Sequence, residues 1–146
     1  MSKPYPEETM RQTAFWAAWF AADWRQEVPV RIHSGSISPD GSPEWHPDFA
    51  KWISRDERPG KRTDAQGLRT TKVMRRLRRA AVREYEVLYR VLVLNERLCE
   101  TTKWLNARAE RNSIPYPKHR PDGPHYVEKD TLALVIAGVG YAREYW

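Results

Sequence analysis

The stretch Leu68–Leu92, "LRTTKVMRRLRRAAVREYEVLYRVL", decides the fold class of this chain. Its apolar positions alternate between three- and four-residue spacings, which is the period of one helix face. These positions are Met74, Leu77, Ala81, Tyr85, Leu88 and Leu92. The spacing predicts one helix or two, with this face buried and the arginines mainly off it.

The same stretch is strongly basic: seven Lys or Arg residues lie within Arg69–Arg83, and no acidic residue does. On a helix, Arg75, Arg76, Arg79 and Arg83 would place several guanidinium groups on one side, each able to fork onto a phosphate or stack on a base. A helix face that is only solvated normally interleaves Glu with Arg, since like charges four residues apart cost roughly 0.2–0.5 kcal/mol. The run therefore favours an anionic partner, either a nucleic acid or an acidic protein.

The whole chain is basic, but its excess charge is concentrated in the middle. Its 146 residues carry 25 Lys or Arg and 19 Asp or Glu, for a net charge of +6 and a pI near 9.6. The segment 55–97 holds thirteen of the basic residues against six acidic ones. Such a balance favours polyanionic partners without identifying one.

The N-terminal segment Glu7–Gln26 is predicted to be a helix rich in aromatic side chains. Acidic residues stand at its start, where the helix dipole is positive, and large apolar residues recur at three- and four-residue spacings. These aromatics either form the core with the C-terminal helices or dock on a partner, as Trp and Phe do at protein interfaces. The candidate partner-binding residues are Trp16, Trp19, Phe20 and Trp24.

The segment that follows is punctuated by Pro, Gly and Ser and is predicted to be irregular. It has room for a short strand at Val28–His33 and one helical turn at Pro47–Ile53. The polar stretch "RDERPGKRTDAQG" comes next and is a candidate linker. We therefore expect residues 1–60 to hold the aromatic helix, the irregular extension and the linker, and residues 61–146 to form a basic helical domain.

Two further helices are predicted in the C-terminal half, with a loop between them. The first covers "RLCETTKWLNARAERN", and the second covers Glu128–Tyr145, which is apolar on nearly every side through Leu132–Val139 and should be buried there. Between them, "SIPYPKHRPDGPHY" contains four prolines and a glycine, which force a loop. The expected fold class is thus mainly α.

The sequence gives no sign of secretion, a membrane span or a disulfide. Acidic residues stand where a secretory signal would be positive, and no run approaches the roughly 20 apolar residues that cross a bilayer. Cys99 is the only cysteine, which excludes an intramolecular disulfide and a thiolate zinc cluster. We expect a cytoplasmic protein without a membrane partner, in which Cys99 is buried.

The candidate catalytic and metal-binding patterns are weak. His119 and His125 share one loop with Asp122, but no second ligand pair accompanies them, so no metal is expected. Glu128 and Lys129 are similar to the acid and lysine of metal-dependent nucleases, which however have a residue between them that puts both on the same side of a strand. We expect no enzymatic activity and no cofactor, with a metal-dependent nuclease as the weakest alternative.

Several segments from Thr70 to Trp146 follow a family pattern: the basic "RRLRR", the "REYEVLY" helix, a short turn at Leu94–Arg97, the supporting "CETTKWLN" helix and the closing "EYW". In these segments the chain resembles small helix-turn-helix proteins of actinobacteriophages that are similar to the fourth region of sigma factors, and phage late-transcription regulators. The resemblance implies that Leu98–Asn112 is the supporting helix and that Glu128–Tyr145 occupies the recognition position in the major groove.

Charge and resemblance together predict a small phage-encoded transcription regulator that binds double-stranded DNA, with a basic helix on the phosphates. The alternative is a protein-binding module that docks on a host factor such as RNA polymerase and modulates it. The residues expected to bind nucleic acid are Lys72, Arg75, Arg76, Arg79, Arg83, Lys118, Arg120, Lys129 and Thr131.

Overall fold

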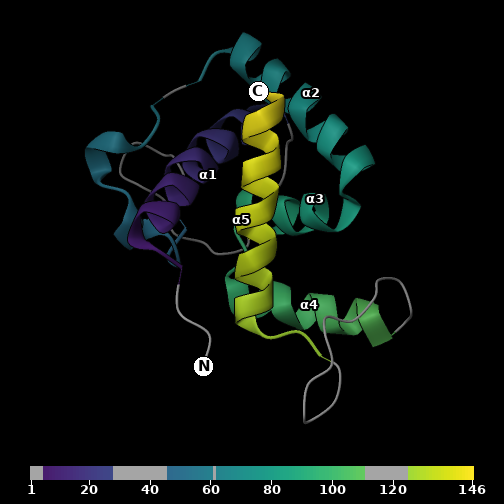
Figure 1. Ribbon diagram of the computed structural model, residues 1–146. Helices are drawn as coiled ribbons and strands as arrows, with labels where there is room; N and C mark the ends of the chain where they lie inside the picture. The colour runs from purple at the N-terminus through teal and green to yellow at the C-terminus, as the bar shows by residue number, and fades with distance from the viewer. Residues whose placement is uncertain (1–4, 28–45, 61, 111–124) are drawn as a thin grey trace.

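The computed structural model describes residues 5–27, 46–60, 62–110 and 125–146 (Figure 1). Within these residues the chain forms five α-helices with short 3-10 and π-helical segments, and no strand. The prediction of a mainly α fold is confirmed. The elements are α1 (Glu7–Glu27), η1 (Ala50–Trp52), η2 (Arg55–Glu57), α2 (Asp64–Ala80), α3 (Val82–Leu88), η3 (Tyr89–Val93), α4 (Leu98–Glu110) and α5 (Glu128–Tyr145).

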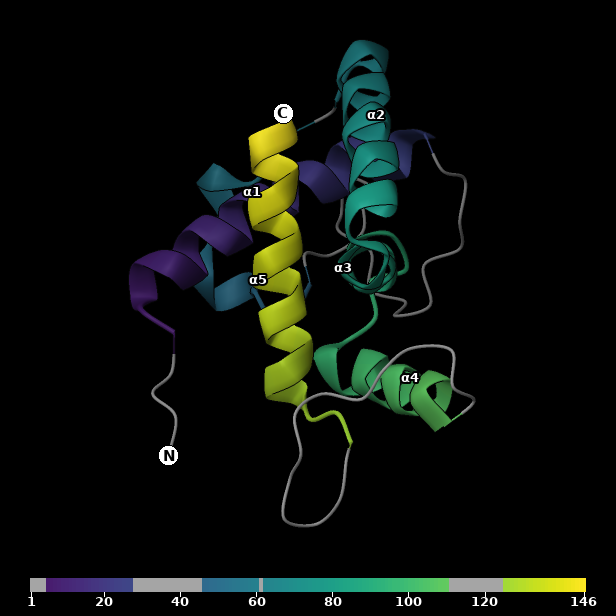
Figure 2. The ribbon, with the colours of Figure 1, turned by 45° about the vertical axis from the view of Figure 1, so that its right-hand side comes forward.

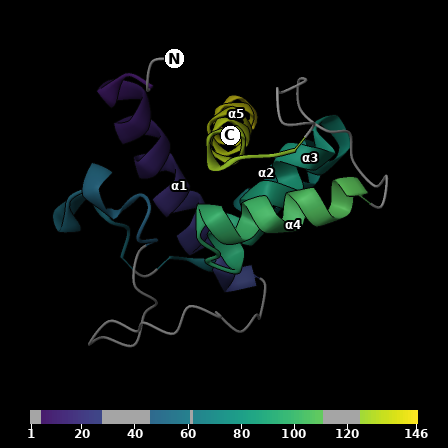
Figure 3. The same cartoon turned by 90° about the horizontal axis from the view of Figure 1, so that it is seen from below.

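Helix α5 lies at the centre of the fold and packs against each of the other four α-helices. Figures 1 and 2 show it running from α4 toward α2, and Figure 3 looks along it, with α1 on one side and α3 and α4 on the other. Its buried residues are Thr131, Val135, Gly138, Val139 and Ala142. The remaining residues of Leu132–Val139 are half-buried, so the burial expected there is confirmed in part.

The basic stretch forms two helices because the backbone breaks at Ala81 (φ −150°, ψ 76°). Helix α2 begins with a capping box, in which Thr63 Oγ1 accepts from the Gln66 N–H (3.3 Å) and Gln66 Oε1 accepts from the Thr63 N–H (2.8 Å). Helix α3 starts directly after the break and buries Val87 and Leu88. Both helices pack against α5, one on each side of this break in the chain.

Helix α3 continues into the π-helical η3 and ends in a tight turn before α4. The Leu94 N–H donates to the main-chain oxygen of Tyr89 (3.1 Å), five residues back, as in a π-helix. Asn95 then takes the left-handed conformation (φ 56°), which Asn tolerates better than most residues. The turn predicted at Leu94–Arg97 is confirmed.

Two residues of the segment that begins at His46 form hydrogen bonds to the turn between η3 and α4. The His46 ring is fully buried; its Nδ1 accepts from the Asp48 N–H (3.1 Å), and its Nε2 lies 2.5 Å from the main-chain oxygen of Glu96. Because a carbonyl oxygen can only accept, Nε2 carries the proton. The Asp48 carboxylate accepts from the N–H of Leu98, the first residue of α4 (2.9 Å), and from Arg97 (3.0 Å). It therefore supplies the negative charge that the N-terminus of α4 favours.

The hydrophobic core is shared by residues from both sides of the expected boundary near residue 60. Helix α1 packs against α2 and α5, and its Phe20 and Trp24 are 1% and 2% exposed. The Trp24 ring centre lies 5.6 Å from that of Tyr85 and 5.5 Å from that of Tyr89. The boundary therefore does not separate two cores. Trp24 is a core residue that a partner cannot reach, which corrects its prediction as partner-binding, and Phe20 belongs mainly to the core as well.

Three smaller expectations have different outcomes. The helical turn predicted at Pro47–Ile53 is confirmed as η1, and the predicted strand Val28–His33 lies outside the described residues. Cys99 is exposed rather than buried, because the inward face of α4 begins with Thr101 and Thr102 instead. No helix in the described part of the chain is long and apolar enough to cross a membrane.

Candidate nucleic-acid interface

The outer face of α2 carries a row of exposed cations, Lys72, Arg75 and Arg79. They recur at three- and four-residue spacings on the side of the helix opposite the buried Val73 and Leu77. At about 1.5 Å rise per residue, the row extends about 10 Å along the helix axis. We call these three residues the outer row.

No carboxylate neutralises the outer row in the part of the chain that the structure describes. None of its members takes part in a salt bridge there, and the sequence has no acid between Asp64 and Glu84. Neighbouring like charges on a helix repel each other by roughly 0.2–0.5 kcal/mol per pair. An anion bound along the row would remove this repulsion.

Two further arginines of α2 lie over aromatic rings at the end of α5. The Arg69 guanidinium lies 4.1 Å from the ring centre of Trp146, and that of Arg76 lies 4.3 Å from the ring centre of Tyr145. Arg69 also donates to the main-chain oxygen of Trp146. Stacking holds a guanidinium in place while its N–H edge remains available to acceptors. Both side chains are exposed and border the outer row on the α5 side.

Arg83 is separated from these residues by the helix break. It lies on α3, is half-buried, donates to the Tyr126 hydroxyl (3.4 Å) and approaches the Glu84 carboxylate (4.0 Å). Arg78 is directed toward α3, with its guanidinium 5.7 Å from the ring centre of Tyr85. Of the cations predicted in this stretch, those of α2 are therefore brought together and Arg83 is not part of the row.

The start of α5 does not extend the outer row. Thr131 is fully buried and shares a hydrogen bond of 2.6 Å with the Thr102 hydroxyl, so the prediction that it contacts nucleic acid is wrong. Lys129 is exposed in the first turn of α5, but that end lies beside α4, whereas α2 lies toward the other end (Figure 2). Lys118 and Arg120 lie outside the described residues.

The outward stripe of α5 is poor in groups that read bases. Lys129 is exposed at its start, and Arg143 is exposed at its border, where it lies over Trp16. Apart from these two cations, the stripe holds the exposed Gly140, Tyr141 and Glu144 and the half-buried Ala133 and Ala137. Glycine and alanine cannot hydrogen-bond base edges, and a carboxylate repels phosphates. With its other sides packed on four helices, α5 offers little to the recognition position that the resemblance implied.

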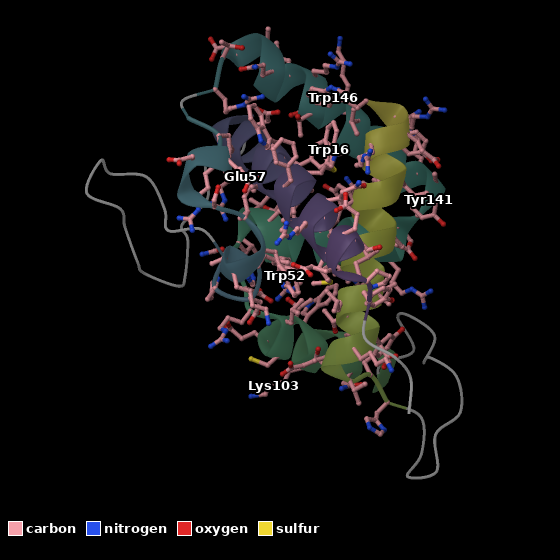
Figure 4. All side chains as sticks on the ribbon, turned by 60° about the vertical axis from the view of Figure 1, so that its left-hand side comes forward. Trp16, Trp52, Glu57, Lys103, Tyr141 and Trp146 are labelled. Carbon is pink, nitrogen blue, oxygen red and sulfur yellow. The ribbon has the colours of Figure 1, made fainter. Side chains whose placement is uncertain are left out.

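A second surface feature is a pocket of ≈ 260 Å³, which we call the aromatic pocket. Figure 4 shows Trp16 of α1 and Trp146 at the end of α5 close together there. The residues that line it are Phe15, Trp16, Trp19, Phe20, Asp23, Arg62 and Trp146. Of the aromatic residues predicted to bind a partner, Trp16 and Trp19 are thus half-buried in the walls of this pocket.

Arg62, Arg69 and Trp146 belong to these two surfaces but are not among the candidate residues predicted from the sequence. A signal was present for Arg69, because it lies seven residues, or about two turns, before Arg76 and so falls on the same side of α2. No local pattern could have placed Arg62, because its position depends on the tertiary contact with Asp23.

The described residues contain no group of three or more His, Cys, Asp or Glu side chains that could hold a metal ion. Glu128 and Lys129 lie in the first turn of a helix rather than on a strand, and His119 and Asp122 lie outside the described residues. The nuclease alternative therefore gains no support from this part of the chain.

Comparison with known proteins assigns no family: no family model, no curated protein and no solved structure matches the chain significantly.

Proposed function

We propose that the protein is a small DNA-binding transcription regulator whose outer row contacts the phosphates of duplex DNA. The observation that carries the proposal is the exposed row Lys72, Arg75 and Arg79, which no described carboxylate neutralises. Arg69 and Arg76 lie beside the row and add two guanidinium groups. Transcription as the setting follows from the resemblance to phage regulators.

The charge density of duplex DNA suits this arrangement better than that of an acidic protein surface. Duplex DNA carries about one negative charge per 1.7 Å of helix axis, counting both strands, so a row about 10 Å long faces a dense and regular line of phosphates. Arginine can bind a phosphate through two parallel N–H donors, whereas lysine acts as a point charge. Acidic protein surfaces seldom present so regular a line of anions.

Phosphate contacts fix the position of a protein on DNA without reading its sequence. We assign to α2 the affinity for DNA and the orientation on it, and we assign base reading to none of the described side chains. This assignment agrees with the outward stripe of α5, which has few side chains that can hydrogen-bond to base edges.

Fluorescence anisotropy with a labelled DNA duplex tests the proposal. The single variants Lys72→Gln, Arg75→Gln and Arg79→Gln are each expected to weaken binding on every duplex sequence to a similar degree. Lys103→Gln is the matched control, because Lys103 is exposed on α4 at the other end of the molecule (Figure 4). Equal weakening by the control, or unchanged binding in all three variants, would contradict the proposal.

A further inference from the structure

The aromatic pocket combines apolar walls with a cationic rim. Three of its wall indoles each carry a guanidinium on the ring face: Arg62 lies 4.0 Å from the ring centre of Trp19, Arg69 4.1 Å from that of Trp146, and Arg143 5.0 Å from that of Trp16. Phe15 and Phe20 complete the aromatic lining.

The two ionised side chains in the described lining of the pocket, Asp23 and Arg62, are already satisfied, whereas the indole N–H of Trp19 is buried without a partner among the described residues. Asp23 is 1% exposed, and its carboxylate accepts hydrogen bonds from Arg62 and from the Thr70 hydroxyl (3.0 Å). Arg62 is therefore neutralised by Asp23, with which it forms a salt bridge. A molecule bound in the pocket would contact mainly the carbon atoms of aromatic rings, together with the Arg62–Asp23 salt bridge.

The rim, in contrast, has two cations that form no salt bridge with a side-chain carboxylate of the described residues. Arg143 is exposed and donates to the neutral Gln12 Oε1 (3.0 Å), and Arg69 is exposed, lies over the Trp146 ring and donates to the main-chain oxygen of Trp146. The rim thus favours negative charge next to whatever fills the pocket.

We propose that the aromatic pocket is a docking site for an acidic protein segment, which inserts one aromatic side chain between Trp16 and Trp146 and places carboxylates on Arg69 and Arg143. The volume is adequate, since an apolar cavity of about 150 Å³ holds a benzene ring, and this pocket measures ≈ 260 Å³. The site goes beyond DNA binding: it shares Arg69 with the surface proposed for DNA, but Lys72, Arg75 and Arg79 of the outer row take no part in it.

A nucleotide would match the charge of the rim but not the chemistry of the walls. A nucleobase carries several donors and acceptors along its edge, and burying them without partners is unfavourable. Among the described lining residues, the ionised Asp23 and Arg62 are bonded to each other, and the buried N–H of Trp19 is a single donor that cannot satisfy the edge of a base. The phenyl or indole ring of a protein side chain has few or no such groups, so it fits better.

A second copy of the chain is also a poorer occupant. The chain has a net charge of +6, so two copies repel each other, and the rim that would face the second copy is itself cationic. A segment rich in Asp and Glu relieves this charge instead of adding to it.

The test is an NMR titration that follows the indole N–H resonances of Trp16, Trp19 and Trp146. The probe is the blocked peptide Asp-Glu-Asp-Phe-Asp-Glu-Asp, with two controls: the same peptide with Ala at its centre, and one with Lys at every acidic position. We expect the Phe peptide to shift these resonances and to bind at least about tenfold more tightly than the Ala peptide, because only it buries a ring. The Lys peptide should not bind.

Two protein variants sharpen the test. Arg143→Glu reverses the charge of an exposed rim residue and should weaken binding of the Phe peptide by about fivefold. Its effect on binding of the DNA duplex should be small. Lys103→Glu is its control and should leave peptide binding unchanged, because Lys103 lies on α4, far from the pocket (Figure 4). Trp16→Ala removes one wall of the pocket and should weaken binding of the Phe peptide by more than about tenfold. Circular dichroism checks that this variant is folded.

Several outcomes overturn this proposal. One is the absence of shifts at millimolar Phe peptide, and another is equal binding of the Phe and Ala peptides. Adenosine monophosphate that shifts the same resonances more strongly than the peptide would assign the pocket to nucleotides. Shifts that appear with rising protein concentration alone, together with a dimer in sedimentation, would assign it to self-association. Loss of DNA binding in the outer-row variants would leave these results untouched, so the two proposals fail separately.

Discussion

At the scale of the residue, Gly138 lies where α5 passes closest to α3. A Cβ built at Gly138 would lie 2.9 Å from Leu88 Cγ and 3.0 Å from Leu88 Cδ1, and Leu88 is fully buried. A close-packed core has no space into which Leu88 could move. Gly140, two residues further along the same helix, has no atom within 4 Å of the corresponding position.

We therefore predict opposite effects for the same substitution at these two glycines. Gly138→Ala should lower the free energy of unfolding by about 1–3 kcal/mol through overpacking against Leu88. Gly140→Ala should raise it by about 0.5–1 kcal/mol, since alanine favours the helix more than glycine does. Urea unfolding of both variants measures the two effects. A stabilised Gly138→Ala would contradict the close contact between α3 and α5.

Residue identity alone predicted part of the candidate site. Arg75, Arg76 and Arg79 could be placed on one exposed surface because helical period decides which side they share. The different contacts of Arg83 could not be foreseen, because they depend on a break at Ala81 that no Pro or Gly marks. The prediction for Thr131 was wrong because a polar side chain suggested an exposed position. In the structure its hydroxyl is buried and shares a hydrogen bond with the Thr102 hydroxyl.

At the scale of the element, the turn between η3 and α4 depends on the buried His46. Burial lowers the pKa of His46 below its ordinary 6.5, although the hydrogen bond to Glu96 and the charge of Asp48 oppose this shift. Burial alone would raise the pKa of Asp48, but its hydrogen bonds from Leu98 and Arg97 hold it below 3.8. Both groups therefore stabilise the fold in the charge state that they hold at neutral pH.

The predicted consequence is a loss of stability in mild acid. The unfolded chain protonates this histidine near pH 6.5 and the folded chain only at lower pH, so the free energy of unfolding should fall as the pH drops below about 6.5. The contribution of Asp48 should be lost only below about pH 3.8. Urea unfolding between pH 7 and pH 5 measures the first effect. His46→Gln should flatten that dependence, and an unchanged slope in this variant would assign the effect to other groups.

Helices were more predictable than the contacts between them. The bounds expected for α1 and α5 agree with the structure to within a residue, because caps, charges and apolar period act locally. The hydrogen bonds of His46 and Asp48 to Glu96 and Leu98 join segments about fifty residues apart in the sequence, and no local pattern encodes them. The central position of α5 likewise follows from packing, since its apolar character indicated burial but not its four neighbours.

At the scale of the whole molecule, one core replaces the two units expected from the linker-like stretch near residue 60. The core residues that α1 contributes include Ala14, Ala17, Phe20, Ala21 and Trp24. The Arg62–Asp23 salt bridge ties the start of the second half directly to α1. A polar, glycine-bearing stretch thus indicated a change of direction and not a domain boundary.

This architecture predicts that residues 61–146 do not fold alone. Without α1, the faces of α2, η3 and α5 that pack against it would be exposed to water. Thermal unfolding followed by circular dichroism should show a cooperative transition for the full chain and none for the fragment. Adding a peptide that covers residues 1–27 should restore part of the transition. A fragment that unfolds cooperatively by itself would show that α1 is an appendage.

The most direct test of the central claim is the salt dependence of duplex binding. Each phosphate contact releases counterions and makes the plot of log affinity against log salt steeper by about 0.9. The wild-type protein should lose affinity steeply as salt rises, and the variant with Lys72, Arg75 and Arg79 all changed to Gln should show a slope reduced by about 2–3. A wild-type affinity that does not change with salt, or a triple variant that keeps the wild-type slope, would contradict a phosphate-binding outer row.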